Sequence, residues 1–412
     1  MTEAPEGDEQ QMDRGYPLAG LKVLDLSRIL AGPVCTQLLA DLGADVVKVE
    51  RPGLGDDTRQ WGPPFASDGG ASGYFLSCNR GKRSLALDLG HPDGQTVLAD
   101  LVRQADALIE NFLPDSLEKL GLTPERLAAS NPQLVNCSIS GFGRTGPLAN
   151  TPGYDLTVQA AAGIMSITGE PDGAPMKVGV AITDVITGLY AAASVLAGLY
   201  SRGKGRGGGS FDLALADCTL ASLVNVAQGA LLTGQRPRRY GNAHPQIVPY
   251  EAFATADGHV TLAIGADRQW QRFCRAVGRE AWAADARFST NPARVEHREA
   301  LLQLLKPLFA ERTTAAWLAL LASAEVPHSP VLAIDEVLQS PQVAAREMVL
   351  EATDAQGRSY RLLGGAVHWQ GEPPRRAVAP PELGQHTDEV LQTWLGYDER
   401  KIQELRHAKA IA

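Results

Sequence analysis

The chain has 412 residues, of which 44% are hydrophobic and 21% are charged, and its formal net charge is −9. This length predicts two domains, and the composition is that of a folded globular protein. The acidic balance disfavours proteins that bind nucleic acids or anionic membranes, which normally carry a basic surface.

The five cysteines are scattered along the chain, with no CxxC pair and no Cys/His cluster at the spacing of a metal site. We therefore expect buried, reduced thiols, no metal and a cytoplasmic location. Residues 1–16 are polar and acidic and lack the basic start and apolar run of a signal peptide, so we expect a disordered lead-in.

The first predicted elements form a βαβ unit. Residues 22–26 predict a strand, and residues 33–42 predict a helix with Pro33 in its first turn. A second strand is predicted at 45–50. Two strands joined by a helix indicate a parallel sheet.

The alternation of strands and helices continues to residue 140. A helix is predicted at 91–104, a strand at 107–111, a short helix from 123 and a strand at 134–140. An apolar stretch at 185–200 is too short and interrupted for a membrane span and predicts a buried helix. A strand at 210–215 and a helix through 220–232 follow a glycine-rich turn. This order predicts an α/β fold with a Rossmann-like large domain.

A smaller α/β domain is predicted next. Apolar runs at 252–255 and 260–263 flank Asp257-Gly258 and predict a β-hairpin, and helices are predicted near 270–277, 300–309 and 315–322. The expected division is a lead-in at 1–16, the first part of the large domain at 17–229, the small domain at 230–335, and a connector at 336–412 that returns to the large domain. Within this last part, 373–381 predicts an extended connector and 387–394 a helix.

Three common kinds of site are disfavoured. The turn after the first strand has one glycine, Gly32, where a dinucleotide-binding loop has three. The glycines at 203–209 lack the order of a phosphate-binding loop and lead into a strand. No G-x-S-x-G motif of a serine hydrolase occurs.

Asp184 lies in a strongly apolar segment, directly before the predicted helix. The simplest interpretation is an acid that stabilises a helix N-terminus by roughly 1 kcal/mol. A nucleophilic carboxylate, ionised but poorly hydrated, would suit the same place. Spacing alone leaves both interpretations open.

A series of motifs in a fixed order resembles the class III CoA-transferases, the formyl-CoA transferase and carnitine-CoA transferase family. The motifs are LAGLKVLDLSRILAGP at 18–33, LADLGADVVKVERPGLGDDTR at 39–59, LSCNRGKRSLALDL at 76–89, IENFLPDSLEKLGL at 109–122, SISGFGRTGP at 138–147, PGYDLTVQAAAGIMSITGE at 152–170, ITDVITG at 182–188 and LGQHTDEVL at 383–391. The resemblance spans about residues 18–396, almost everything after the lead-in.

The resemblance implies that Asp184 is the nucleophile, which forms an anhydride with the acyl group of an acyl-CoA and then a thioester with CoA. Acyl-CoA and a carboxylic acid are then substrates, and no permanently bound cofactor is expected. The resemblance also implies an interlocked homodimer, with a large domain formed by both chain ends.

The family pattern carries CoA contacts onto further positions. They are Leu30, Ala31, Arg51, Leu76, Ser77, Cys78, Asn79, Asn111, Phe112, Lys119, Tyr154 and Asp155. Lys119 stands where the family usually has arginine, so it keeps the charge but loses the bidentate geometry. Arg51 and Lys119 are expected phosphate partners, although exposed surface charges are the simpler interpretation of each.

Two alternatives remain open. The family includes 2-methylacyl-CoA racemases, whose Gly-His-Asp segment supplies a histidine base; here the segment is Gly153-Tyr154-Asp155, and a phenol is a poor base at neutral pH. A catalytically silent CoA-binding protein is the other alternative.

The nearest likeness is to the branch acting on dicarboxylates, of the succinyl-CoA:glutarate and hydroxymethylglutarate type. It rests on WGPPF at 61–65, RRYGNAHPQIVPYEAF at 238–253 and AIGADRQW at 263–270, where formyl-CoA transferases have a loop richer in glycine than the segment around Gly265. The candidate cations for a second substrate carboxylate are Arg238, Arg239, His244 and Arg268.

Overall fold

The computed structural model describes residues 15–67, 70–369 and 377–412, so most of the predicted lead-in and part of the proline-rich connector lie outside the described residues. The chain forms two compact units. The first holds the described residues up to Ala162, then Gly179–Val224 and Ala344–Ala412. The second holds Gly163–Val178 and Asn225–Val343. The sequence-based boundaries at 229/230 and 335/336 differ from these limits by a few residues, and they leave 163–178 in the large domain.

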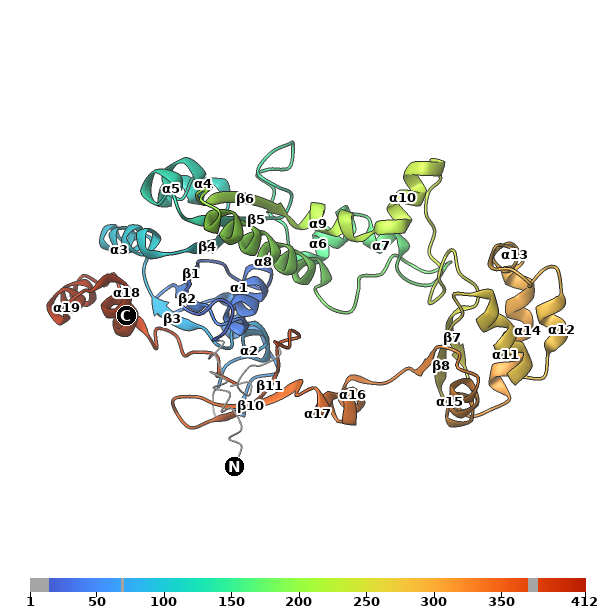
Figure 1. Ribbon diagram of the computed structural model, residues 1–412. Helices are drawn as coiled ribbons and strands as arrows, with labels where there is room; N and C mark the ends of the chain where they lie inside the picture. The colour runs from blue at the N-terminus through green and yellow to red at the C-terminus, as the bar shows by residue number, and fades with distance from the viewer. Residues whose placement is uncertain (1–14, 68–69, 370–376) are drawn as a thin grey trace, which may run out of the picture. The chain divides into compact units, whose positions relative to one another are not determined.

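The first unit is built on a parallel six-stranded sheet (Figure 1), which confirms the predicted α/β class. Its strands are β1 (Lys22–Asp25), β2 (Asp45–Glu50), β3 (Arg83–Ala86), β4 (Ala107–Glu110), β5 (Val135–Ser140) and β6 (Gly209–Ala214). The order across the sheet is β3-β2-β1-β4-β5-β6, and all five pairings are parallel. The order reverses between β1 and β4, and ligands of such sheets bind at this point, beyond the carboxyl ends of the strands.

Helices connect these strands and cover the sheet. The first unit contains α1 (Ala31–Asp41), the 3₁₀ helix η1 (Asp57–Gln60), α2 (Gly73–Cys78), α3 (Pro92–Gln104), α4 (Pro114–Leu120), α5 (Pro124–Ser130), α6 (Asp155–Ala161), α8 (Ile182–Gly203), α9 (Leu215–Ser222), α18 (Thr387–Leu395) and α19 (Glu399–His407). A hairpin of β10 (Val349–Thr353) and β11 (Ser359–Leu363) belongs to the same unit.

The sheet has a separate hydrophobic core on each face. On one face, α1 and α8 pack around a cluster that includes Cys35, Leu39, Ala192 and Val195. On the other face, the cluster combines residues of α3 and α5 with the C-terminal helices α18 and α19, which lie beside α3 in Figure 1. Residues from both ends of the chain therefore complete one core.

Helix α8 contains the apolar stretch predicted as a buried helix. Its glycines permit close packing, because a Cβ on Gly188 would lie 2.7 Å from the Ala31 carbonyl oxygen and one on Gly198 would lie 2.6 Å from Val135. By length and composition, α8 could cross a membrane, as could the bent pair α9 and α10 taken together. Ala191, Ala192 and Val195 of α8 are nevertheless buried in the core, which confirms the prediction of a buried helix.

The second unit has an antiparallel three-stranded sheet, β7 (Tyr250–Ala254), β8 (His259–Ala263) and β9 (His328–Pro330). The β7–β8 pairing confirms the hairpin predicted around Asp257-Gly258. Its helices are α7 (Ile164–Ile167), α11 (Asp267–Ala276), α12 (Glu280–Ala284), α13 (Asn291–Glu296), α14 (Arg298–Ala310), α15 (Thr314–Ser323) and α16 (Ile334–Leu338), while α10 (Val224–Thr233) and α17 (Pro341–Ala345) cross its limits. The core contains stacked aromatic rings, with Phe309 4.4 Å from Phe253 and 4.3 Å from Trp317 between ring centroids.

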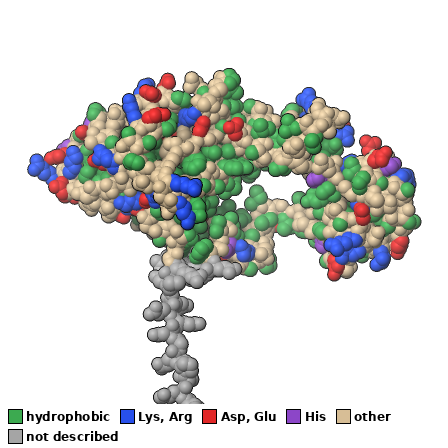
Figure 2. Space-filling model, turned by 45° about the horizontal axis from the view of Figure 1, so that its top comes forward, with side chains coloured by type: hydrophobic (Ala, Val, Ile, Leu, Met, Phe, Trp, Pro, Cys, Tyr) green, Lys and Arg blue, Asp and Glu red, His purple; other side chains and the backbone are tan. Residues whose placement is uncertain are grey.

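Cysteines and surface charge follow the sequence-based expectations. All five cysteines are buried and unpaired. On the face seen in Figure 2, basic and acidic side chains are interspersed over the described surface and do not form a broad basic patch there.

Candidate active site

The loop that follows β1 lies at the point where the strand order reverses. At the end of β1, the buried Asp25 carboxylate accepts hydrogen bonds from the Ser27 and Thr36 hydroxyls and from Lys82 Nζ, the last at 3.1 Å. Burial alone would raise the pKa of Asp25, but the ammonium groups of Lys82 and Lys48 hold it at about 2. An ionised carboxylate thus anchors the start of this loop.

The loop is also joined to the end of β4. Asn111 accepts a hydrogen bond from the Arg28 backbone N–H at 3.0 Å and donates one to the Arg28 carbonyl oxygen at 2.9 Å. This reciprocal pair links the two strand ends on either side of the reversal. Asn111 was predicted to contact CoA, and in the structure its side chain binds the protein backbone.

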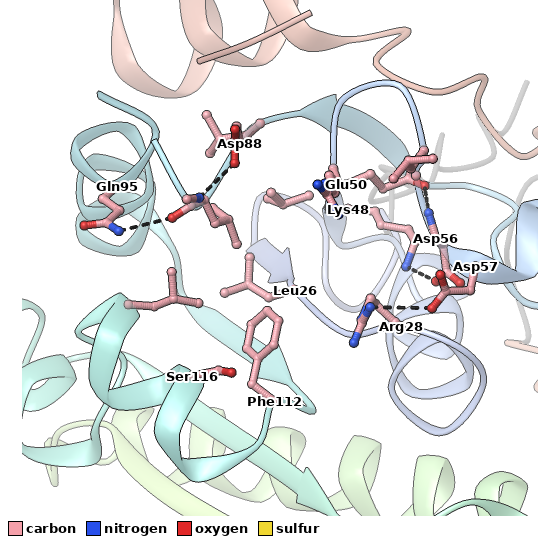
Figure 3. Close-up of a pocket in the computed structure, with 18 of the residues that line it drawn as sticks. Leu26, Arg28, Lys48, Glu50, Asp56, Asp57, Asp88, Gln95, Phe112 and Ser116 are labelled. Carbon is pink, nitrogen blue, oxygen red and sulfur yellow. Dashed lines mark hydrogen bonds and ion pairs between the residues drawn. The ribbon is translucent and has the colours of Figure 1, made fainter. Parts of the chain in front are cut away.

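A hollow of about 860 Å³ opens beside these strand ends (Figure 3). Leu26 and Phe112 form an apolar part, while Arg28, Lys48, Glu50, Asp56 and Asp57 lie together on one side. Two expected phosphate partners, Arg51 and Lys119, also line this hollow. Its size and mixed lining suit a large ligand with an apolar part and anionic groups.

A second hollow, of about 240 Å³, contains Asp184. It shares Arg28 and Phe112 with the larger one. The expected site residues that line it with Asp184 are Leu30, Ala31, Asn111, Phe112 and Tyr154. The structure therefore brings together residues from four separate segments of the chain.

Asp184 lies in the first turn of α8, three positions after the helix cap Ala181. Its carboxylate has no hydrogen-bond or ion-pair partner among the described residues, so it does not act as a helix cap. Burial and, to a smaller extent, the nearby charge of Asp155 together raise the pKa of Asp184 from 3.8 to about 7. An unpartnered, partly buried acid with a pKa near neutrality is typical of a functional group.

Asp155 has a different environment from Asp184. Its Oδ1 accepts hydrogen bonds from the Thr183 N–H at 2.9 Å and hydroxyl at 2.6 Å, and its Oδ2 accepts one from Gln159 at 2.7 Å. These bonds tie the start of α6 to the residue that precedes Asp184. Asp155 was predicted to contact CoA; in the structure, its Oδ1 holds the start of α8 through Thr183, and its Oδ2 binds Gln159 of its own helix. Tyr154, one position earlier, is exposed at the hollow.

Two site residues escaped the sequence-based prediction. Burial and, to a smaller extent, the charge of Asp184 raise the pKa of Tyr74, on α2, to about 12. The Tyr74 hydroxyl therefore keeps its proton and can donate a hydrogen bond. Arg144 lines the smaller hollow and donates to the Phe112 carbonyl oxygen at 2.8 Å and to Glu110 at 3.1 Å. The SGFGRTGP motif contained the signal for Arg144, but no spacing pattern distinguished Tyr74.

The four predicted contacts of α2 and its cap do not line either hollow. Asn79 accepts a hydrogen bond from Lys82 at 2.9 Å and donates one to a backbone oxygen of its own helix. Cys78 is buried, Ser77 is exposed, and Leu76 packs against the cluster of the β10–β11 hairpin. Their contact with CoA stays a prediction.

The four candidate cations of the second unit are not equivalent. Arg239 donates to the carbonyl oxygens of Glu170, Pro171 and Gly173 and thus fastens a turn of its own unit. His244 accepts a hydrogen bond from the Gln246 N–H. Arg238 lies over the Tyr240 ring, 4.7 Å from its centroid, at a hollow of about 520 Å³, and Arg268 is exposed on α11.

The segment around Gly265 is held by the helix that follows it. The Gln269 side-chain oxygen accepts the N–H groups of Gly265 and Ala266, both at 3.0 Å. This bonding caps α11. Within the described residues, no group of three or more His, Cys, Asp or Glu side chains is arranged to hold a metal ion.

The chain is similar to members of one protein family along most of its length. The model of CoA-transferase family III matches residues 18–387. A succinate–glutarate CoA-transferase of Agrobacterium fabrum is 43% identical over 383 residues, which cover 92% of this chain and 96% of that protein. A human succinyl-CoA:glutarate CoA-transferase is 39% identical over 410 residues, which cover 100% of this chain and 92% of that protein.

A solved structure shares the same fold. The crystal structure of a CAIB/BAIF family protein from Brucella suis superimposes with a TM-score of 0.80 at 42% sequence identity. The match covers 92% of this chain and 99% of that one. Sequence and structure thus agree along almost the whole chain.

Proposed function

Because the chain belongs to CoA-transferase family III, we propose that it moves CoA from a dicarboxylyl-CoA thioester to a carboxylic acid, with Asp184 as the covalent nucleophile. The observation that carries this proposal is the partly buried carboxylate of Asp184, which shares a hollow with Leu30 and Ala31 at the start of α1 and has no hydrogen-bond partner among the described residues. Asp184 thus has the freedom that a nucleophile needs.

In the first half of the proposed reaction, an Asp184 oxygen attacks the thioester carbonyl carbon. The C–S bond breaks, CoA leaves as a thiolate, and the donor acyl group forms an anhydride with Asp184. The thiolate then attacks the Asp184 carbonyl carbon. The donor carboxylate leaves, and CoA stays bound to Asp184 as a thioester.

In the second half, the acceptor carboxylate attacks this thioester and releases the thiolate, and the second anhydride forms. The thiolate attacks the acyl carbon of the acceptor, which yields the new acyl-CoA and restores Asp184. The reaction needs no ATP, because each activated acyl bond is exchanged for another of similar energy.

The backbone supplies donors for the oxyanions of these steps. Leu30 is the cap of α1 and Ala31 its first residue, and both line the hollow with Asp184. The first N–H groups of a helix have no acceptor within the helix. No described residue accepts from the N–H of Leu30 or Ala31, so both are available to stabilise a developing negative charge.

The larger hollow would hold the nucleotide part of CoA. Arg51 and Lys119 provide positive charge for its phosphates, and Phe112 and Leu26 offer an apolar surface. Because the two hollows share Arg28 and Phe112, the pantetheine arm would pass between these residues on its way to Asp184.

A specific observation also favours the racemase alternative, because an acid with a pKa of about 7 can exchange protons at neutral pH. A racemase needs a second base, however, and the segment that supplies it elsewhere contains Tyr154. Incubation with acyl-CoA followed by hydroxylamine or borohydride would separate the hypotheses. Modification of Asp184 supports transfer, exchange of an α-proton without an adduct supports racemisation, and binding without either supports a silent CoA-binding protein.

The substrates are proposed from the relatives, two of which are named as transferring CoA between succinate and glutarate. A panel of acyl-CoA donors against dicarboxylate and monocarboxylate acceptors, with products identified by mass spectrometry, tests this. Equal rates with both acceptor classes would contradict the dicarboxylate preference. Asp184→Ala should abolish transfer without loss of the fold, and retained transfer would exclude the mechanism.

We also propose that the chain forms an interlocked homodimer. Helix α10 has no buried residue, and its Leu231 and Leu232 are 79% and 77% exposed; Ile334 of α16 is 80% exposed. Apolar surface of this kind in a monomer is typical of an interface. Light scattering of the full chain tests the stoichiometry, and a monomeric mass at micromolar concentration would contradict the proposal.

A cytoplasmic location is proposed as well. The five buried, unpaired cysteines support a reducing compartment. Cell fractionation with an antibody against the chain tests this location.

A further inference from the structure

Ile29, in the loop between β1 and α1, has a backbone conformation that is unusual for its residue type. Its φ is 71°. This left-handed region is unfavourable for a β-branched side chain, so the surrounding structure must hold it there. Ile29 directly precedes Leu30 and Ala31, and these residues line the hollow that contains Asp184.

Three buried side chains, which we call the Asp56 clamp, hold this residue: Asp56, Lys48 and Thr58. The Asp56 carboxylate accepts the Ile29 N–H at 3.2 Å, and Lys48 Nζ lies 2.9 Å from the same oxygen. The other oxygen of Asp56 accepts the Thr58 N–H at 3.0 Å and its hydroxyl at 2.8 Å. Figure 3 shows Lys48 directed toward Asp56 at the edge of the larger hollow.

The clamp acts on the loop at two points. Besides its bond to Asp56, Lys48 Nζ donates to the Ser27 carbonyl oxygen at 2.8 Å. The side chains of Lys48 and Asp56 are 1% and 0% exposed, so neither charge is screened by solvent. A buried ion pair contributes little to stability on balance, because desolvation offsets the attraction. Its value here lies in the geometry that it imposes on the loop.

We propose that Asp56 is a positioning residue for CoA transfer: it holds Ile29 in the left-handed conformation and thereby keeps the first N–H groups of α1 beside Asp184. This inference rests on the proposed function, and nothing in the sequence resemblance assigned a role to Asp56. Asp56 does not touch the reacting atoms in this account. Its effect reaches the reaction through the conformation of the loop at Ile29.

The test is a double-mutant cycle in the full-length chain with Asp56→Asn, Ile29→Gly and both together. Asp56→Asn should lower kcat about tenfold, because a hydrogen bond to an ionised group is lost from the loop. Glycine adopts positive φ without strain, so Ile29→Gly should restore most of the loss in the double variant, measured relative to the Ile29→Gly single variant. An effect of Asp56→Asn that Ile29→Gly does not reverse would overturn the inference.

Two matched controls separate positioning from general stability. Asp45→Asn removes a carboxylate at the opposite end of β2, where it binds Arg83 and Trp394, and should lower Tm without changing kcat. Lys409→Gly places glycine at another positive φ, of 61°, near the C-terminus, and should restore nothing in the Asp56→Asn background. Restoration by Lys409→Gly would contradict a specific action through Ile29.

If Asp56→Asn does not fold, Thr58→Val provides the test in its place. This variant keeps the ion pair between Lys48 and Asp56 and removes the hydrogen bond from the Thr58 hydroxyl to Asp56. It should lower kcat about two- to fivefold, again reversed by Ile29→Gly. Hydrogen exchange of the peptide spanning 26–34 needs no turnover: exchange should rise in Asp56→Asn or Thr58→Val and fall again with Ile29→Gly. Unchanged exchange overturns the inference, whereas a wild-type chain that transfers no CoA overturns the proposed function alone.

Discussion

The raised pKa of Asp184 predicts a strong pH dependence for the first chemical step. With a pKa of about 7, roughly 10% of this carboxyl is ionised at pH 6 and roughly 90% at pH 8. Only the ionised form attacks a thioester, so the rate of adduct formation should rise about tenfold over this interval. An acid with the ordinary value of 3.8 would be ionised throughout and would give a flat profile.

The assay is a single-turnover measurement with an acyl-CoA donor and no acceptor, in which the Asp184 adduct is trapped with hydroxylamine at each pH. Leaving out the acceptor avoids its own titration. Asp155→Asn removes the charge that contributes to the shift but keeps an oxygen for Thr183, so the profile should move to lower pH. Asp217→Asn, which replaces an exposed acid of α9, is the matched control and should leave the profile in place.

The same pKa has a consequence for stability. A carboxyl whose pKa rises on folding stabilises the protein fully below pH 4, and this contribution is lost as the pH rises through 7. The ionised group then lowers the free energy of unfolding by at most about 4 kcal/mol. Asp184→Asn should therefore raise Tm at pH 8 and leave it unchanged at pH 4. A flat adduct profile between pH 6 and 8, together with no pH-dependent gain in Tm, would refute the reasoning.

Three further predictions concern the surroundings of the site. Lys119→Gln should raise the KM for acyl-CoA about two- to fivefold without changing kcat, with a smaller effect at high salt; an unchanged KM at low salt would contradict a phosphate contact. Asn111→Ala removes both hydrogen bonds to the loop after β1 and should reduce the free energy of unfolding by about 1–3 kcal/mol, measured by urea denaturation. Gly188→Ala, whose Cβ would lie 2.7 Å from a backbone oxygen of α1, should destabilise by about 1–3 kcal/mol, whereas Gly203→Ala, in open space, should not; equal Tm values for the two variants would exclude tight packing as the cause.

Local patterns in the sequence predicted much of the large unit. The second strand was predicted at 45–50 and β2 occupies Asp45–Glu50, because a short buried run between turn residues has few alternatives. Strand β3 (Arg83–Ala86) was not predicted, because its sequence, RSLA, begins with two polar residues and contains no apolar run. The sequence also did not predict that residues 163–178 belong to the second unit, because the limits of a compact unit depend on contacts between distant residues, which local patterns do not show.

The candidate site was less predictable from local sequence patterns than the fold. The hydrophobic pattern indicated only that Asp184 is an acid at the start of a helix, and the structure places it in the first turn of α8. Its lack of a hydrogen-bond partner among the described residues and its raised pKa depend on surfaces contributed by distant segments, so spacing could not reveal them. The left-handed Ile29 and the buried partnership of Lys48 and Asp56 escaped prediction for the same reason: the bonds that hold them cross from one strand end to another.

The contribution of α18 and α19 to the core of the large unit bears on how the protein is made in the cell. Until this last part of the chain leaves the ribosome, one face of the sheet lacks Val390, Trp394 and Ile402. At about 5–20 residues per second, the stretch from Ala344 to Ala412 takes roughly 3–14 seconds to synthesise. During that time the nascent chain exposes the apolar surface that these helices will cover. A chain from which α18 and α19 were deleted should therefore be unfolded in the first unit, and not simply shorter, because the core on that face of the sheet would be incomplete.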